Sequence, residues 1–312
     1  MAAESKTAVV AALLGNAALA VMKGVAAAVT GSASMLAETF HSIADTGNQG
    51  LLMLGMRLGS RPPDERHRFG HGKDVYFWAF VVSMMLFTLG GAFSIWEGVR
   101  HFLHPTERQS LVWAYGVLAG GFVFEAISFG VAVRSVWHEK KGRTLREYWR
   151  DTRDPTLLTV VCEDSAALVS LAIAATGISL GHWTGNTAWD AGASALIGLV
   201  LLGVAVLLAF ENYSLLLGET APARVEATID RVVEDERAVR AVRDLRTMHL
   251  GPHGLLIVIS VEFAPGLDTA GIESAVRRLR GRLAAVLADT TLPPLIVIEP
   301  ASGSQRTRDA AA

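Results

Sequence analysis

Residues 32–56 carry a row of side chains that could hold a metal ion in an otherwise apolar stretch. The segment has no Lys or Arg, yet it contains Glu38, His41, Asp45 and Asn48. Their spacing of i, i+3, i+7 and i+10 places all four on one face of a helix. Ionisable groups in a membrane are costly and persist where they face a partner, an ion or water. His41 and Asp45, one turn apart, suit a borderline divalent cation such as Zn²⁺. The row therefore predicts cation handling inside the bilayer, with Glu38 and Asn48 as gate or lining residues, or else as packing residues.

A second apolar segment is expected to complete this site. Asp164 lies in the middle of that segment without a basic neighbour, and a cation held by His41, Asp45 and Asp164 would compensate its charge. Glu163 is rotated by about 100° from Asp164 on a helix, but its longer side chain could reach the same ion. Two alternatives stay open: His41 and Asp45 could form a hydrogen bond that joins helices, and Glu163 could pair with Lys23 or another intramembrane group.

A third group of possible ligands lies in the polar segment RPPDERHRFGHGKD, residues 61–74. Asp64, His67 and His71 are spaced closely enough to bind a metal ion, beside two glycines. The alternative is a solvated basic loop in which the histidines are incidental. This segment is therefore a possible loop metal site.

Six stretches could position these residues across roughly 30 Å of hydrocarbon, and 51% of the 312 residues are hydrophobic. A removable signal peptide is the alternative for the first stretch. The links after the second and fourth stretches are rich in Lys and Arg, so we expect those links and both termini to be cytoplasmic. The composition is compatible with a bacterial inner membrane. The predicted spans are residues 7–30, 32–59, 75–96, 111–133, 155–180 and 191–210.

The charge balance and the cysteine content narrow the function. The formal net charge of −2 offers no basic surface for nucleic acid. The single cysteine excludes an intrachain disulfide and a thiolate zinc cluster.

The composition changes after residue 217, where mixed-charge helical patterns and alternating strand patterns follow one another. Their order, αββαβ, predicts a small two-layer α+β domain of the ferredoxin-like type in the cytoplasm. The predicted organisation is a six-helix transmembrane domain (residues 1–217), this α+β dimerisation domain (218–300) and a disordered tail (301–312).

Four segments together resemble the cation diffusion facilitator family, which are dimeric zinc-type metal/proton antiporters. They are GSASMLAETFHSIADTGNQ, PDERHRFGHGK, GGAFSIWEGVRHFLHP and VRDLRTMHLGP. The resemblance implies six spans, cytoplasmic termini, a homodimer, and a transport site between spans two and five. His41 and Asp45 match the family's ligand pair in span two, and Asp64 and His71 match a loop site that some members use.

The chain departs from the family pattern at two places. Val160 stands one turn before Asp164, where the family usually has a ligand, so the fourth ligand could be Glu163, water or Glu38. In the last domain the family's metal-binding positions carry Arg243, Ser260 and Glu299. That domain is therefore expected to dimerise, together with spans three and six, rather than to sense metal.

These observations predict proton-coupled export of a divalent transition-metal cation by alternating access, with Zn²⁺ as substrate and H⁺ as counter-ion. Mn²⁺, Fe²⁺ and Co²⁺ are alternative metals. A degenerate, non-transporting family member that binds a membrane partner is the alternative function. The sequence contains neither GxSxG nor HExxH, so we do not expect an enzyme.

Overall fold

The computed structural model describes residues 2–105, 111–140, 142–152, 155–252, 254–287 and 294–301. Residues 302–312 of the predicted tail lie outside these ranges. The chain divides into two compact units: Met1–Arg57 with Phe77–Tyr213, and Leu58–Tyr76 with Ser214–Ala312. The predicted domain limits at residues 217, 218 and 300 stay predictions.

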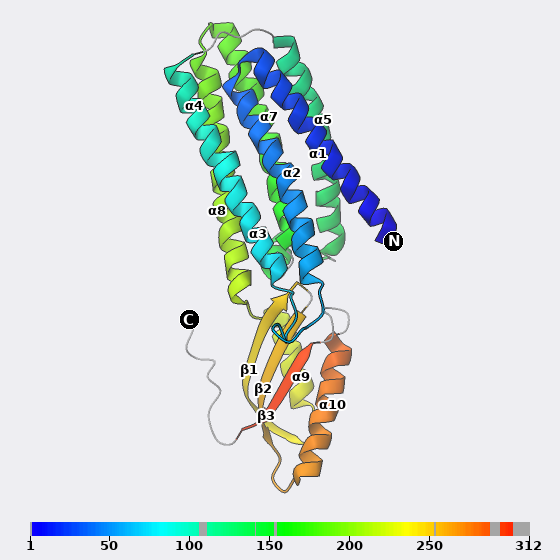
Figure 1. Ribbon diagram of the computed structural model, residues 1–312. Coiled ribbons are helices and arrows are strands. Elements are labelled where there is room, and N and C mark those ends of the chain that lie inside the picture. Colours follow the sequence, from blue (N-terminus) through cyan, green and yellow to red (C-terminus); the bar gives the residue numbers. More distant parts are fainter. Residues whose placement is uncertain are drawn as a thin grey trace. The chain divides into compact units, whose positions relative to one another are not determined.

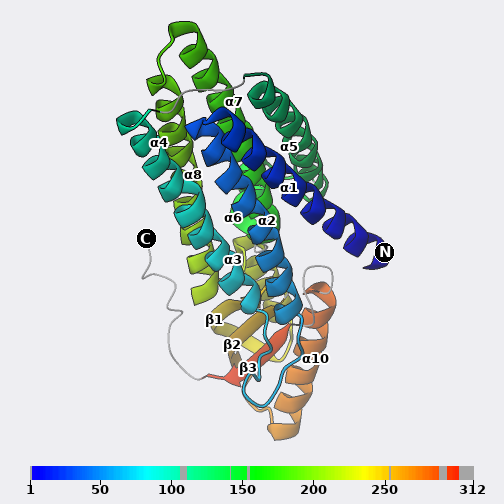
Figure 2. The same ribbon diagram turned by 45° about the horizontal axis from the view of Figure 1, so that its top comes forward.

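The first unit is built from long helices (Figures 1 and 2). Five of its segments are α1, α2, α5, α7 and α8, and a further continuous helical stretch consists of α3, a π-helical segment η1 and α4. A short helix, α6, follows α5 and begins with a capping box, in which Thr144 and Glu147 each accept a hydrogen bond from the other's backbone N–H. The bounds are α1 Ala2–Thr30, α2 Ala33–Gly59, α3 Asp74–Met85, η1 Leu86–Ala92, α4 Phe93–Leu103, α5 Leu111–Glu139, α6 Leu145–Asp151, α7 Pro155–Thr184 and α8 Ala188–Leu217.

Four helical stretches among the described residues are long and apolar enough to cross a membrane. They are Asp74–Leu103, Val112–His138, Pro155–Thr184 and Ala188–Leu217, and they confirm four of the six predicted spans, each with a later C-terminal end. A shorter apolar helix covers Asn16–Thr30. The 27-residue α2 is not among the four, because its row of polar side chains lowers its hydropathy. Its role as a span, and that of α1, stay predictions.

Glycines let the α3–η1–α4 stretch pack tightly against α8. A Cβ atom at Gly98 would lie 2.7 Å from the carbonyl oxygen of Ala191, and one at Gly198 would lie 2.7 Å from that of Gly91. Small residues of this kind allow the close helix approach that drives association in membranes. The π-helical turn η1 falls within this contact, where Gly91 meets Leu202.

The second unit contains α9 (Ala223–Glu234), β1 (Val239–Gly251), β2 (Gly254–Phe263), α10 (Thr269–Leu287) and β3 (Leu295–Pro300). The element order is αββαβ, and the sheet order is β1-β2-β3. β2 pairs antiparallel with β1 and parallel with β3, so the sheet is mixed. Its core forms where alternate β2 residues meet the apolar faces of both helices; among its members are Ile229, Val233, Ile257, Ile259, Leu279 and Leu283.

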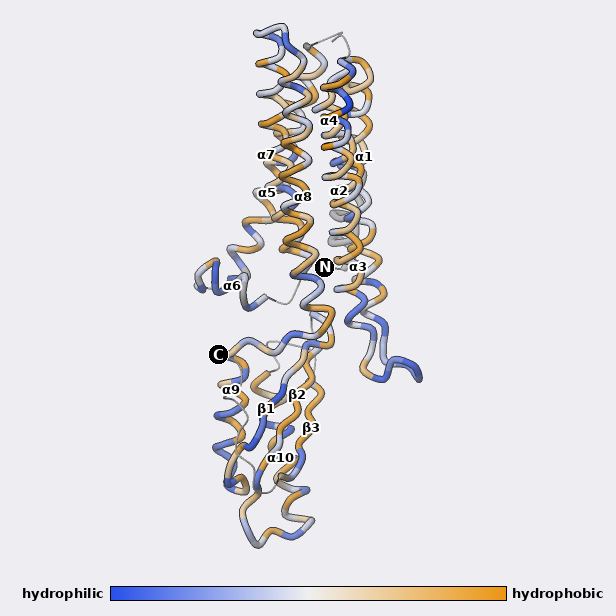
Figure 3. The backbone as a smooth tube through the Cα atoms, turned by 90° about the vertical axis from the view of Figure 1, so that its left-hand side faces the viewer, coloured by the Kyte–Doolittle hydropathy of each residue, from blue (hydrophilic) through white to orange (hydrophobic). Residues whose placement is uncertain are grey.

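Residues 58–76 belong to this second unit and form a polar loop, seen as the blue tip between α2 and α3 in Figure 3. A Cβ atom at Gly72 would lie 2.4 Å from the carbonyl oxygen of Leu250. Only glycine therefore lets the loop backbone approach the β1–β2 turn this closely.

Candidate metal transport site

The predicted row on α2 faces the interior of the first unit. The side chains of Glu38, His41 and Asn48 are fully buried, and Asp45 is 13% exposed. His41 Nδ1 lies 3.5 Å from Asp45 Oδ1, as expected for an i, i+4 pair on one helix face. Both ring nitrogens of His41, together with Asp45 Oδ1, are buried without a hydrogen-bond partner among the described residues. The alternative of a hydrogen bond that joins His41 to another helix is therefore absent among these residues, and these three atoms are left available to a cation.

α7 contributes the carboxylates opposite this row. Asn48 Nδ2 donates to Glu163 Oε1 at 2.5 Å, which joins α2 directly to α7. Ser128 on α5 donates to Asp164 Oδ2 at 2.8 Å. Asp45 is close enough to Glu163 and Asp164 for electrostatic interaction with both. The structure thus brings α2 and α7 together at the predicted ligands.

The donors on α2 and α7 are not gathered as tightly as in a formed metal site. Among the described residues, the group of three His or acidic residues whose ligand atoms all lie within 4.8 Å of one another is in the 58–76 loop. His41, Asp45, Glu163 and Asp164 form no such group. Their assignment as ligands stays a prediction, and binding through this set would need side-chain movements that bring the donors closer together.

Lys23 on α1 forms an ion pair with Glu38, one of the predicted gate residues. Its ammonium group, fully buried, donates to Glu38 Oε2 at 2.9 Å and to Ser42 Oγ at 2.8 Å. The alternative that Glu163 pairs with Lys23 or another intramembrane group is met by the other group, because Glu163 accepts a hydrogen bond from Asn48. A buried lysine placed on a carboxylate neutralises a charge that would otherwise be expensive at this depth.

The loop ligands lie close together. Asp64 Oδ2 is 3.0 Å from His71 Nε2, and Asp64 Oδ1 is 3.3 Å from His67 Nδ1. Backbone N–H groups of His67 and Arg66 also donate to Asp64, at 2.6 and 2.9 Å. The hydrogen bonds from the His67 backbone and the His71 side chain lower the pKa of this exposed carboxyl to about 2. A carboxylate and two imidazoles within 4.8 Å are a plausible N/O ligand set for a divalent cation.

Comparison with known proteins identifies the family. Residues 9–217 match the cation efflux transmembrane domain. The chain belongs to the cation efflux family. The matched segment is the transmembrane domain of a transporter family, so the chain is an integral membrane protein.

This cation efflux protein is similar in sequence to several named proteins. The proton-coupled zinc antiporters SLC30A9 of mouse and human mitochondria are 34% identical over 236 residues, which is 75% of this chain and 42% of theirs. Metal tolerance protein C4 of Arabidopsis thaliana is 31% identical over 232 residues, or 73% of this chain and 50% of its own. Magnetosome protein MamM of Magnetospirillum gryphiswaldense is 28% identical over 239 residues, covering 75% and 69%. The chain thus spans about two fifths of the length of the zinc antiporters.

In the last domain of this cation efflux protein, the three residues that depart from the family pattern, Arg243, Ser260 and Glu299, contact other side chains. Arg243 forms an ion pair with Glu262, to which Arg240 also donates at 2.8 Å. Ser260 donates to Glu299 at 2.5 Å, across paired positions of β2 and β3. A guanidinium group cannot ligate a cation, so these contacts fit a structural rather than a metal-binding role.

Sequence reasoning gave three polar residues too little weight. The sequence suggests Lys23 only as a possible partner of Glu163, and it assigns no partner to Glu125, the single charge in its apolar stretch. Glu125 is buried on α5 and interacts electrostatically with Lys23 and Asp164. Ser128, one turn later, positions Asp164. A lone charge in an apolar span was the available signal, but its partners depend on helix packing.

Proposed function

We propose that this protein exports a divalent transition-metal cation by alternating access, with Zn²⁺ as the favoured substrate and H⁺ as the counter-ion. The observation that carries the proposal is the buried His41–Asp45 pair: both ring nitrogens of His41 and Oδ1 of Asp45 lack hydrogen-bond partners among the described residues, and Asp45 interacts electrostatically with the carboxylates of α7. In this proposal His41, Asp45 and Asp164 are ligands, and Glu163 is the fourth ligand or a close neighbour.

The donor types support zinc. One imidazole with carboxylate oxygens is a borderline N/O set, whereas all-oxygen sites favour Mg²⁺ or Mn²⁺. Two of the named relatives are described as zinc antiporters. Mn²⁺, Fe²⁺ and Co²⁺ are the competitors that a direct assay must separate.

Proton coupling follows from the chemistry of the imidazole. His41 must be neutral to bind metal, so protons and cations compete for its ring nitrogens. A site open to a less acidic side would take up metal, and the same site open to an acidic side would take up a proton and release the metal.

The same proposal gives roles to the other helices, the α+β domain and the loop. α1 and α2 complete a six-span bundle with cytoplasmic termini, in a bacterial inner membrane. The glycine contacts between the α3–η1–α4 stretch and α8 support a rigid pair that could serve as the scaffold of a homodimer, together with the α+β domain. Asp64, His67 and His71 form a second, loop metal site.

The test is uptake of ⁶⁵Zn²⁺ by the full-length protein in liposomes with an imposed proton gradient. We expect uptake that depends on the gradient and falls at least tenfold in Asp45→Asn and Asp164→Asn. Asp268→Asn, in the loop before α10, removes the same charge at an exposed position and should leave uptake unchanged. Normal uptake in the first two variants, or uptake indifferent to the gradient, would disprove the proposal. Competition by Mn²⁺, Fe²⁺ and Co²⁺ in the same assay ranks the metals.

A further inference from the structure

α5 carries an exposed apolar stripe that ends at the cationic side chain of Arg134. Val123, Ile127 and Val131 follow one another at i, i+4 and i+8, and they are 59, 63 and 62% exposed. Because α5 is one of the membrane-crossing helices, these side chains face lipid. A Cβ atom at Gly120 or Gly130 would meet nothing within 4 Å, so the surface beside the stripe is open.

Aromatic side chains mark the depth of this stripe in the bilayer. Trp113 and Trp137 are 57 and 60% exposed, near opposite ends of α5. About 24 residues separate them, or about 36 Å of helix, which fits the spacing of the two membrane interfaces. Arg134 lies one turn inside the Trp137 end, so its guanidinium is at the level of lipid headgroups.

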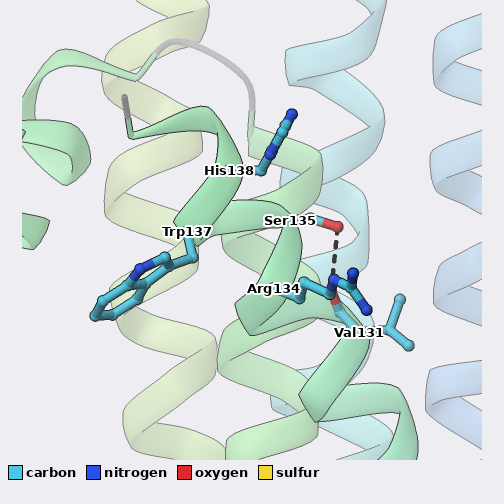
Figure 4. Close-up of a pocket in the computed structure, with 5 residues that line it drawn as sticks. All are labelled: Val131, Arg134, Ser135, Trp137 and His138. Carbon is cyan, nitrogen blue, oxygen red and sulfur yellow. Dashed lines mark hydrogen bonds between the residues drawn. The ribbon is translucent and has the colours of Figure 1, made fainter. Parts of the chain in front are cut away.

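A recess of about 630 Å³ opens at this level. It is lined by Val131, Arg134, Ser135, Trp137 and His138 (Figure 4). Ser135 Oγ donates to the carbonyl of Val131, which keeps this hydroxyl bound to its own helix. Figure 4 shows Arg134 and Val131 on one side of α5 and Trp137 projecting from the other. No ion pair joins Arg134 or His138 to any side chain that the structure describes.

We propose that this recess binds the phosphate of an anionic phospholipid, with an acyl chain lying along Val131, Ile127 and Val123. A guanidinium at the edge of the hydrocarbon is stabilised by an anionic partner, and its planar fork matches two phosphate oxygens. The His138 ring, one turn further along, supplies a second donor. The apolar stripe begins one turn below Arg134, so one ligand can satisfy both surfaces. Zwitterionic lipids bind less well because their ammonium group is repelled by Arg134.

The test is native mass spectrometry of the full-length protein in detergent, with phosphatidylglycerol or phosphatidylcholine added in steps. We expect preferential retention of phosphatidylglycerol. Arg134→Gln and His138→Gln should each weaken that preference, by about fivefold for the arginine charge. Arg134→Lys should keep part of it. The matched control is Arg146→Gln, which removes the same charge from an exposed position of α6.

Three results would overturn the proposal: equal retention of the two lipids, equal effects of Arg134→Gln and Arg146→Gln, or full displacement of phosphatidylglycerol by inorganic phosphate. The last result would mean that the recess takes a free anion and the acyl chain contributes nothing. Because Arg134 and His138 are exposed, their variants should unfold at the wild-type temperature without added lipid, and this is measured alongside. Should one of them unfold early, the other and Arg134→Lys carry the test.

Discussion

At the scale of residues, the buried polar groups of the first unit are sorted by their partners. Lys23 donates a hydrogen bond to one oxygen of Glu38. Asn48 donates one to Glu163, and Ser128 donates one to Asp164. His41 and Asp45 keep atoms without hydrogen bonds among the described residues. This division separates the groups that fix the helices from the pair that is available to a cation.

The Lys23–Glu38 pair gives the first prediction. Lys23→Met leaves the Glu38 carboxylate buried without its cation, and breaking a buried pair in this way costs about 3–5 kcal/mol. Adding Glu38→Gln removes the uncompensated charge, so the double variant should recover most of the loss. Thermal unfolding of the purified protein in detergent measures both. If the double variant is as unstable as the single one, the two groups do not compensate each other.

At the scale of elements, Asp190 fastens the beginning of α2 to α8. Its carboxylate accepts from the backbone N–H of Ala33 and the hydroxyl of Ser32, each at 2.8 Å, and from the Ser34 hydroxyl. Asp190 is itself in the first turn of α8, so two helix N-termini stabilise one buried negative charge. The helix that carries His41 and Asp45 is thereby fixed at one end.

We therefore expect Asp190→Asn to destabilise the first turn of α2. Hydrogen bonds to a charged acceptor contribute about 1.5–3 kcal/mol each, and the amide keeps only part of this. Hydrogen exchange should be at least tenfold faster in residues 31–36 and nearly unchanged in α5. Ser179→Ala, which removes a different interhelical hydrogen bond (to Tyr115), is the control. Exchange in residues 31–36 at the wild-type rate would show that Asp190 does not anchor the helix.

The Glu236–Arg278 contact predicts a pH dependence of the second unit. Arg278 Nη2 donates to Glu236 at 2.8 Å and lowers the pKa of this carboxyl below its usual value near 4.5. The lowered pKa means that the contribution to stability is complete above that usual value and is lost as pH falls through the lower one. Since Arg278 is 52% exposed, we expect only about 0.5–1 kcal/mol.

Thermal unfolding of the wild type and of Glu236→Gln checks this. The wild type should be more stable by a few °C at pH 7, and the difference should close as pH falls through the lowered pKa of Glu236. A difference that stays constant with pH would mean that packing, not the charge of Glu236, stabilises this contact.

At the scale of the whole molecule, two candidate metal sites belong to different units. Asp64, with its pKa near 2, is ionised throughout the physiological range, so its carboxylate is available as a ligand at every such pH. We expect Asp64→Asn/His71→Gln to bind one fewer Zn²⁺ per chain, with gradient-driven uptake within about twofold of the wild type. Equilibrium dialysis with ⁶⁵Zn²⁺ gives the stoichiometry. Unchanged stoichiometry would show that the loop does not bind Zn²⁺.

The helices and the αββαβ order could be predicted from the sequence because apolar length and periodicity are local properties. So could the common face of Glu38, His41, Asp45 and Asn48, which depends only on helical spacing. The partners could not be predicted. Whether Asn48 or Lys23 meets Glu163 depends on how α1, α2 and α7 pack, and the π-helical turn η1 depends on its contact with α8.

The central claim is that one cation is held by an imidazole of α2 and carboxylates of α2 and α7. X-ray absorption of bound Zn²⁺ tests it directly, in a chain whose loop site has been removed by Asp64→Asn/His71→Gln. The account predicts about four N/O ligands near 2.0–2.1 Å, including one imidazole whose signal disappears in His41→Gln. A zinc ion coordinated by oxygen alone, or an imidazole signal that survives His41→Gln, would contradict it.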